Sequence, residues 1–371
     1  MTNRTTPIFR PLLPSADALL PYLRQIDENR WYTNLGPLVR RFEGRLSELF
    51  NCPVVTSANG TLAISQALRV LDVDRPMLCA LPAWTFVGSV AAVQAAGLQP
   101  CFVDIDPATW TFSPSNLKEQ LNLDEVGAVL PVSPFGAPLD LDAWGSFTTE
   151  TGIGVVIDAA AAFDAMSVRN TPPPCPIIVS LHATKTFGVG EGAIILCSDE
   201  TMAMRIRSLG NFGFEHTREA LIAGVNTKIS EYTAAVGLAA LDSWERCREG
   251  WADLTKRFAA HTRPLKDVTL MPHYGEDWVS SYGNVILPKA VDIEETIAAL
   301  AARGVETRRW WGAGCHRHRA YTDVRRVPLP HTDALAAKVL GLPFWLGLSE
   351  DSTASVFSSL AEVLHIPNAG S

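Results

Sequence analysis

The 371-residue sequence lacks several features that mark whole classes of protein. It has no block of lysine and arginine and a net charge of −8, so we expect no nucleic-acid partner, because phosphate binding needs a clustered basic face. Gly, Ser and Gln interrupt its longest apolar stretch, residues 86–98, and the first eight residues contain no apolar run. We therefore expect neither a membrane span nor a signal sequence.

Cysteine is also sparse and scattered. The seven cysteines lie singly, and the sequence contains no Cys-x-x-Cys motif and no Cys/His cluster. This spacing excludes the common zinc-binding and disulfide patterns, so we expect no metal site. The cysteines are expected to be reduced, mostly buried thiols in a cytoplasmic protein.

Apolar residues make up 47% of the chain, and from Val54 onward they form short runs that alternate with helical stretches. This alternation predicts an α/β fold with a mostly parallel central sheet. We expect a large domain over residues 1–245, including an N-terminal arm, and a smaller C-terminal α/β domain over residues 246–371. The expected strands of the large domain are residues 77–81, 99–103, 128–132, 154–157, 177–180 and 193–197, and its helices include residues 61–71, 85–96 and 115–121.

Helical periodicity and capping residues predict the elements outside this sheet. Ser15 caps one expected helix, and Gly341 follows another as a C-terminal stop. The expected helices are residues 15–26, 38–49, 230–261, 292 onward, 332–340 and 352–364, and the expected strands are residues 282–287 and 305–308.

Three segments carry residues suited to a phosphate-bearing cofactor, and they follow the short apolar runs at residues 53–56, 154–157 and 177–180. Gly60 and Thr61 open a helix, whose free N–H groups suit a phosphate, although a plain helix cap has the same sequence. Asp158 ends a buried strand and could pair with a ring cation or form a structural salt bridge. Lys185 precedes glycines that let a loop wrap round a ligand, although an isolated lysine there is usually a surface residue. Their order and position favour one shared site, because ligands bind at the carboxyl ends of parallel strands.

Longer segments of the sequence resemble the DegT/DnrJ/EryC1/StrS family of pyridoxal-phosphate (PLP)-dependent nucleotide-sugar aminotransferases. The resemblance runs through nearly the whole chain and implies the fold-type-I PLP-transferase architecture. The segments that carry it are residues 31–37 (WYTNLGP), 59–61 (NGT), 81–87 (LPAWTFV), 103–106 (VDID), 134–138 (PFGAP), 157–160 (IDAA), 180–192 (SLHATKTFGVGEG) and 224–231 (GVNTKISE).

The resemblance also implies roles for individual residues. Lys185 would form the imine link to PLP, and Asp158 would keep the pyridine nitrogen protonated. Phe86 would stack on the cofactor ring. The expected phosphate contacts are Gly60, Thr61, Ser180 and, from a neighbouring subunit, Asn226. The site would then be shared within a homodimer.

Substrate contacts are expected from the residues Thr33, Asn34, Lys228 and His316. The sequence departs from similar proteins at two points near the site. Ala161 stands where many of them have Gln or His beside the cofactor's phenolic oxygen, and Lys228 stands where they have Arg. A lysine lacks the arginine fork that binds phosphate with two parallel hydrogen bonds. The adjacent Trp310 and Trp311 could face a sugar or base, or simply pack.

By resemblance, the expected reaction moves an amino group from an amino acid, glutamate in the simplest case, to a nucleotide-linked keto sugar. The residues of the segments 31–37 and 181–185 favour a dTDP-4-keto-6-deoxyhexose as the substrate. The reaction would then belong to deoxyamino sugar biosynthesis, for lipopolysaccharide or for natural-product glycosylation. Two alternatives stay open. One is amination of a 3-keto nucleotide sugar, and the other is a non-catalytic PLP-binding regulatory or scaffold protein of the same fold.

Overall fold

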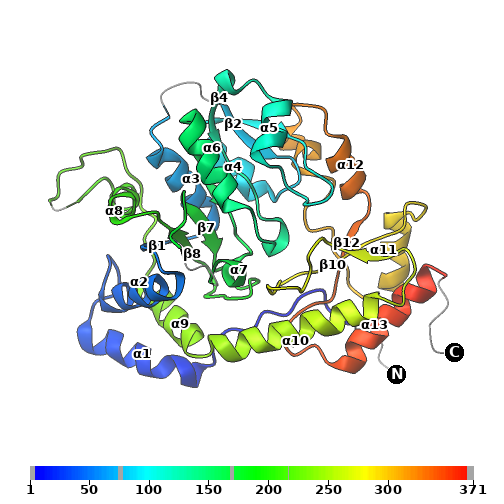
Figure 1. Ribbon diagram of the computed structural model, residues 1–371. Coiled ribbons are helices and arrows are strands. Elements are labelled where there is room, and N and C mark those ends of the chain that lie inside the picture. Colours follow the sequence, from blue (N-terminus) through cyan, green and yellow to red (C-terminus); the bar gives the residue numbers. More distant parts are fainter. Residues whose placement is uncertain (1–4, 74–77, 168–170, 216, 366–371) are drawn as a thin grey trace.

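The computed structural model describes residues 5–73, 78–167, 171–215 and 217–365. Its centre is a sheet enclosed by helices, with a smaller sheet to one side and a long helix, α10, running beneath both (Figure 1). The expected α/β layering is confirmed. Met77, the first residue of the strand expected over residues 77–81, lies outside the described residues.

The central sheet consists of two hydrogen-bonded groups. One has the order β11-β3-β2-β4-β5 and is parallel throughout, and the other has the order β1-β8-β7-β6. In the second group β6 and β7 are parallel, whereas β8 runs against both β7 and β1. A parallel bridge between Val132 and Asp158 joins the two groups. The strands are β1 (Val54–Ser57), β2 (Leu78–Pro82), β3 (Gln99–Val103), β4 (Val126–Val129), β5 (Gly154–Val155), β6 (Ile157–Asp158), β7 (Ile177–Ser180), β8 (Ala193–Leu196) and β11 (Arg325–Arg326).

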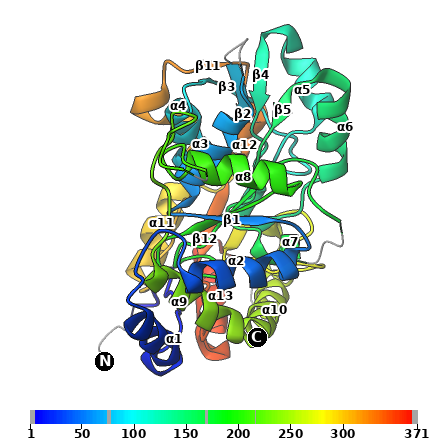
Figure 2. The same cartoon turned by 90° about the vertical axis from the view of Figure 1, so that its left-hand side faces the viewer.

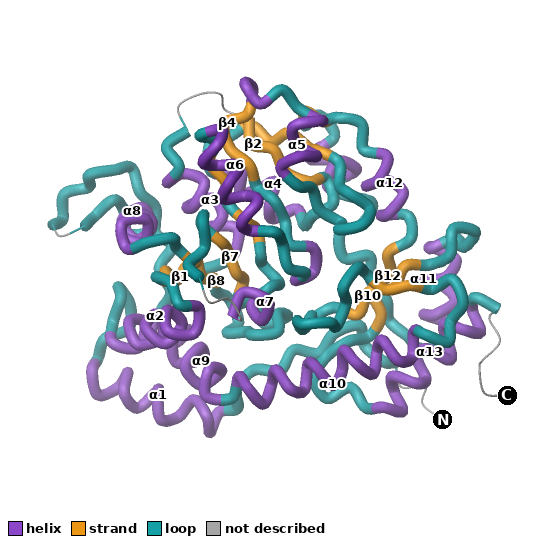
Figure 3. Tube along the Cα trace, in the orientation of Figure 1, coloured by secondary structure: helices purple, strands orange, loops and turns teal. Residues whose placement is uncertain are grey.

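Both faces of this sheet are buried, which explains why its strands are short apolar runs rather than alternating ones. Along β8, Ile195 faces one hydrophobic cluster, whereas Ile194 and Leu196 face the other. Helices α3, α4 and α8 cover the first face, and the second packs on α2, α5, α6, α7 and α9 (Figures 2 and 3). The helices of this part of the chain are α1 (Ala16–Asn29), α2 (Pro37–Phe50), α3 (Gly60–Val70), α4 (Val87–Ala95), α5 (Pro114–Gln120), α6 (Leu141–Thr151), α7 (Phe163–Ser167), α8 (Glu200–Leu209) and α9 (Glu231–Asp242).

The smaller sheet is antiparallel, with the order β12-β10-β9, and it packs on α10. Between β10 and β12 the chain returns to the large sheet, where β11 pairs with β3 and α12 lies on the same side of the molecule (Figure 1). The division at residue 245 stays a prediction. No helix among the described residues is long and apolar enough to cross a membrane. The remaining elements are α10 (Trp244–Thr262), β9 (Thr269–Leu270), β10 (Gly283–Ile286), α11 (Ile293–Ala302), α12 (Pro330–Ala336), β12 (Val339–Leu342) and α13 (Glu350–Val363), with short 3-10 helices η1 (Leu123–Glu125), η2 (Pro134–Gly136), η3 (Cys315–Arg317) and η4 (Arg319–Tyr321).

Four expected elements differ from the structure. The strand expected over residues 154–157 is divided at Val156 into β5 and β6. The helix expected over residues 332–340 is wrong in its second half, because α12 ends at Ala336 and β12 follows. Gly341 lies inside β12, where a side chain would collide with Trp310, so it permits close packing and does not cap a helix. The helix expected over residues 230–261 is interrupted at Ser243, and the strand expected over residues 305–308 is reduced to isolated bridges.

Candidate active site

The direction of the strands brings the predicted site residues to one edge of the central sheet. Strands β2, β6 and β7 are parallel, and β1 runs the same way because β8 is antiparallel to both of its neighbours. Their carboxyl ends lead directly into Gly60 after β1, Phe86 after β2, Asp158 at the end of β6 and Ser180 at the end of β7. Ligand sites in open α/β sheets lie at such an edge.

Close contacts join the segments that follow β1, β2 and β7. A Cβ atom built on Gly60 would lie 3.6 Å from Ser180 Cβ, and one built on Gly88 would lie 3.2 Å from Thr61 Oγ1 and 3.1 Å from the Phe86 ring. Helix α3 begins at Gly60, with Asn59 as its N-cap. The free N–H groups of its first turn therefore lie close to the hydroxyl groups of Thr61 and Ser180. Together these donors suit a phosphate. Phe86 is 58% exposed, which leaves its ring available to a ligand.

Asp158 is buried beneath this edge. Its carboxylate accepts a hydrogen bond from Ser89 Oγ at 2.6 Å and another from the Ala160 N–H at 3.2 Å. Burial raises the pKa of Asp158, while these two hydrogen bonds and the positive charge of Lys185 partly oppose the rise. No ion pair with Asp158 occurs among the described residues. A buried acid in this condition fits a cationic ligand such as a protonated ring nitrogen.

Lys185 lies in the loop between β7 and β8, which closes on itself through a bridge between His182 and Gly190. Gly190 has φ +99°, a conformation that favours glycine. The Lys185 Nζ donates a hydrogen bond to the Tyr282 hydroxyl at 2.8 Å. The structure thus brings Lys185 within electrostatic reach of Asp158, as the sequence predicted, and adds a tyrosine that directly precedes the small sheet.

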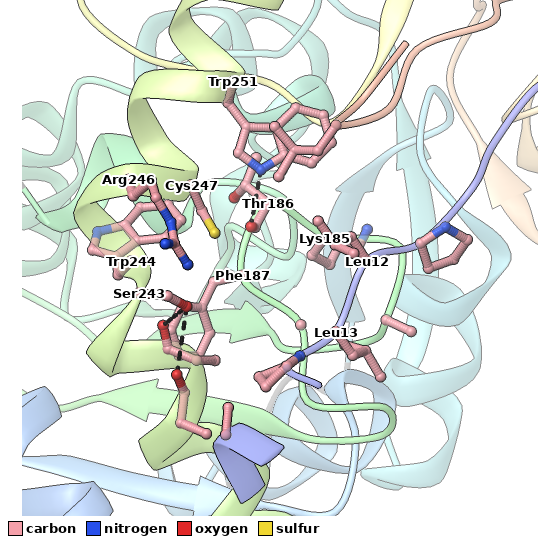
Figure 4. Close-up of a pocket in the computed structure, with 18 of the residues that line it drawn as sticks. Leu12, Leu13, Lys185, Thr186, Phe187, Ser243, Trp244, Arg246, Cys247 and Trp251 are labelled. Carbon is pink, nitrogen blue, oxygen red and sulfur yellow. Dashed lines mark hydrogen bonds between the residues drawn. The ribbon is translucent and has the colours of Figure 1, made fainter. Parts of the chain in front are cut away.

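A cavity of about 490 Å³ borders the Lys185 loop. Figure 4 shows Lys185, Thr186 and Phe187 along one side, with Leu12 and Leu13 of the N-terminal segment and Trp244 of α10 around them. Asp158, Gly60 and Ser180 do not line it. The expected cofactor contacts therefore lie at the sheet edge, and Lys185 is the one of them that also lines this cavity.

Asn226 and Lys228 lie on the segment that follows α8. The carbonyl of the intervening Thr227 accepts a hydrogen bond from the Ala58 N–H at 2.7 Å, two residues before Gly60. The Asn226 side chain is exposed. The Lys228 Nζ lies 4.6 Å from the centre of the Phe212 ring with no hydrogen-bond partner among the described residues, and burial lowers its pKa. The Asn226 side chain is therefore open to solvent, whereas the Lys228 amino group is buried and unpaired within the described part of the chain.

Thr33 and Asn34 are exposed in the loop between α1 and α2. The loop is held against the start of α9, because the Tyr32 carbonyl accepts a hydrogen bond from the Glu231 N–H at 3.0 Å. The Glu231 carboxylate in turn accepts hydrogen bonds from the N–H groups of residues 38 and 39 at the start of α2. The structure therefore brings this loop to the end of the segment that carries Lys228.

His316 and the two tryptophans are largely packed. His316 is 5% exposed, and its Nε2 lies 2.9 Å from a carboxylate oxygen of Asp333. Trp311 stacks on Phe135 with ring centres 4.0 Å apart, which supports the packing interpretation for that residue. A substrate contact by His316 stays a prediction.

Sequence reasoning missed Ser89 and Tyr282. Ser89 lies three residues after Phe86 in the first turn of α4, so its position just after a strand end was a usable signal. Tyr282 is separated from Lys185 by 97 residues and directly precedes β10 of the small sheet, and no local pattern in the sequence joins the two. Ala161 offers no polar side-chain atom, as expected from the sequence.

Comparison with known proteins agrees with this geometry. Residues 15–361 match the model of the DegT/DnrJ/EryC1/StrS aminotransferase family. The dTDP-4-amino-4,6-dideoxy-D-glucose transaminase of Shigella dysenteriae is 28% identical over 96% of this chain and 99% of its own length.

Two solved structures support the same assignment. A protein from Bacillus cereus, assigned as a PLP-dependent aminotransferase, superposes with a TM-score of 0.91 at 28% identity, covering 96% of this chain and all of that one. DesI, solved in the presence of its TDP-sugar product, superposes with a TM-score of 0.87 at 28% identity over 97% of this chain and 93% of that one. These likenesses confirm the fold-type-I architecture. The chain belongs to the DegT/DnrJ/EryC1/StrS aminotransferase family.

Proposed function

We propose that this aminotransferase moves an amino group from glutamate to a nucleotide-linked keto sugar, a dTDP-4-keto-6-deoxyhexose. The observation that carries the proposal is the meeting of Lys185, Asp158 and the start of α3 at one sheet edge. The choice of sugar is supported by the Shigella transaminase and by the TDP-sugar product of DesI. Thr33, Asn34, Lys228 and His316 are proposed to contact this substrate.

PLP is the cofactor of this aminotransferase, and the chain's residues fit it. Asp158 is a buried acid that forms no ion pair with any described residue, which suits a pyridinium nitrogen. Gly60, Thr61 and Ser180 are proposed to hold the phosphate, and the exposed Phe86 ring to cover the pyridine. When bound, PLP supplies a ring that takes up the negative charge left on the donor's α-carbon.

Two side chains of this site handle protons in the proposed reaction. Lys185 acts as the general base, because its Nζ takes the proton that leaves the α-carbon of the amino donor. In the second half-reaction the same Nζ delivers a proton to the sugar carbon that receives nitrogen. Asp158 would keep the ring nitrogen of the cofactor protonated, and the hydrogen bonds from Ser89 and Ala160 orient its carboxylate.

An activity screen tests the substrate. Purified protein with PLP and glutamate is offered dTDP-4-keto-6-deoxyhexoses, 3-keto nucleotide sugars and other nucleotide-linked keto sugars, and products are identified by mass spectrometry. We expect amination of the dTDP-4-keto sugar. Amination of a 3-keto sugar alone would overturn the choice of substrate. If glutamate does not transfer its amino group to the bound PLP, the non-catalytic alternative would be favoured.

We also propose that two copies of the chain pair and that each presents Asn226 to the other's site. The segment that carries Asn226 extends outward beyond α8 (Figure 1) and exposes apolar side chains. Phe212, Leu221, Ile222 and Val225 on it are each at least 40% exposed. Apolar side chains gathered in one segment are typical of an interface.

Leu221→Asp tests this pairing, because a charge at the centre of an apolar interface is costly to bury. We expect the native protein to have the mass of a dimer in light scattering and Leu221→Asp to shift toward the monomer and lose activity. Ala298→Asp, an exposed site on α11, serves as the control and should stay dimeric. A native protein that is monomeric and fully active would contradict the shared site.

A further inference from the structure

The hydrogen bond between Lys185 and Tyr282 joins the loop that follows β7 of the central sheet to the segment that leads into β10 of the small sheet. Lys185 Nζ lies 2.8 Å from the Tyr282 hydroxyl and 5.2 Å from the centre of its ring. Tyr282 is 9% exposed and comes directly before β10 of the small sheet. No other hydrogen bond of this amino group occurs among the described residues, so its position depends on Tyr282.

Hydrogen bonds hold the backbone of Tyr282, and two aromatic contacts hold its ring. Its N–H donates to Ser280 Oγ at 3.0 Å, and its carbonyl accepts from the Tyr274 hydroxyl at 3.1 Å. Its ring packs edge-on against Phe135 and Trp310, with ring centres 5.3 and 5.0 Å apart. A side chain held at both its backbone and its ring presents its hydroxyl at a defined point.

The segment leading to Tyr282 is also tied to the Asp158 side of the site. The fully buried Asp164, six residues after Asp158, accepts a hydrogen bond from the Val279 N–H at 2.9 Å. Arg248 pairs with the same carboxylate at 2.5 Å. The Ser280 hydroxyl donates to the Phe135 carbonyl at 2.9 Å. These bonds fix the position of Tyr282 relative to the sheet edge that carries Asp158.

The turn at Phe135 also passes beside Ala161. Gly136, with φ +99°, approaches the Ala161 carbonyl so closely that a Cβ atom on it would lie 2.6 Å from the oxygen. Since Ala161 has no polar side-chain atom, it cannot orient the lysine or a ligand on this side. Phe135, the neighbour of Gly136, packs against the ring of Tyr282, whose hydroxyl accepts the hydrogen bond from Lys185.

We infer that Tyr282 is a positioning residue for Lys185. This inference rests on the proposed function, in which Nζ must carry a proton to and from a reacting carbon. Lysine has a long, flexible stem, so an amine that is not bonded to the cofactor can leave its working position. The Tyr282 hydroxyl holds the amine in place by accepting its hydrogen bond, and small displacements of a catalytic group are costly to the rate.

Tyr282→Phe removes the hydroxyl and keeps the ring that packs on Phe135 and Trp310. We expect kcat to fall by about 10- to 100-fold, with KM values for glutamate and the keto sugar changed less than threefold. After cofactor-free protein is mixed with saturating PLP, the near-visible absorption should rise more slowly, because the same amine must reach the cofactor. Tyr22→Phe is the matched control. It removes another buried tyrosine hydroxyl, bonded to Asp242 at 2.5 Å, and should leave both rates unchanged.

Rates within twofold of the native protein in both measurements would overturn the inference. Two further variants keep it testable if Tyr282→Phe does not fold. Tyr282→Gln retains a hydrogen-bond acceptor, so its kcat should be higher than that of Tyr282→Leu. Equal kcat values in the two variants would contradict a role for the hydroxyl. The proposed function is judged separately. Activity in Lys185→Ala refutes the role of the lysine, whereas an inactive Lys185→Ala beside a fully active Tyr282→Phe refutes only the present inference.

Discussion

Lys185→Ala is expected to lower turnover by on the order of 10⁴-fold or more and to remove the near-visible absorption of the bound cofactor. Both effects share one cause. In the proposed site the Lys185 side chain would supply both the nitrogen that links to PLP and the base that moves the proton, and alanine can do neither. Steady-state assays and an absorption spectrum of the purified variant measure the two effects.

Lys118→Ala is a suitable control for Lys185→Ala. Lys118 is exposed and pairs with Glu150 at 3.2 Å, and such surface pairs contribute little to stability. The control should keep native turnover and a native spectrum. Native turnover in Lys185→Ala would mean that another group does the chemistry assigned to this lysine.

Asp158→Asn is expected to lower kcat by roughly 10²- to 10³-fold while PLP stays bound, an effect of the size seen when one electrostatic stabiliser is removed. Asparagine keeps the shape of the side chain and an oxygen that can accept from Ser89. It removes the negative charge that would hold the ring nitrogen protonated, so the ring loses much of its capacity to take up charge. Steady-state kinetics and cofactor absorbance of the variant test this directly.

Asp104→Asn provides the matched control for Asp158→Asn. Asp104 is also a buried acid directly after a strand of the central sheet, at 5% exposure. Its carboxylate accepts hydrogen bonds from the N–H groups of His331 and Thr332, which indicates a structural role. We expect the control to lower the melting temperature rather than kcat. An unchanged rate in Asp158→Asn would mean that another group protonates the ring.

The central sheet and much of the site were predictable from local sequence. Strands buried on both faces appear as short apolar runs, as in residues 177–180 and 193–197. Because β1, β2, β6 and β7 point the same way, residues that follow each strand must meet at one edge. This rule and the family resemblance together predict that Gly60 lies close to Ser180. They also predict that the charge of Lys185 acts on Asp158.

Contacts between distant parts of the chain could not be predicted in this way. Gly341 looks like a helix stop in the sequence, and only its packing against Trp310 shows why the chain continues into β12. Tyr282 meets Lys185 because the Asp164 and Ser280 hydrogen bonds bring the small sheet to the site. Such contacts depend on tertiary packing, which leaves no periodic signal along the sequence.

Mapping the cofactor's attachment point tests the central claim most directly. The PLP-loaded protein is treated with borohydride, which makes a lysine–cofactor link permanent, then digested and analysed by peptide mass spectrometry. We predict that the added mass lies on Lys185, within the peptide that contains Thr184 and Thr186. Attachment to any other lysine, or to none in protein that retains its activity, would contradict the assignment of this site.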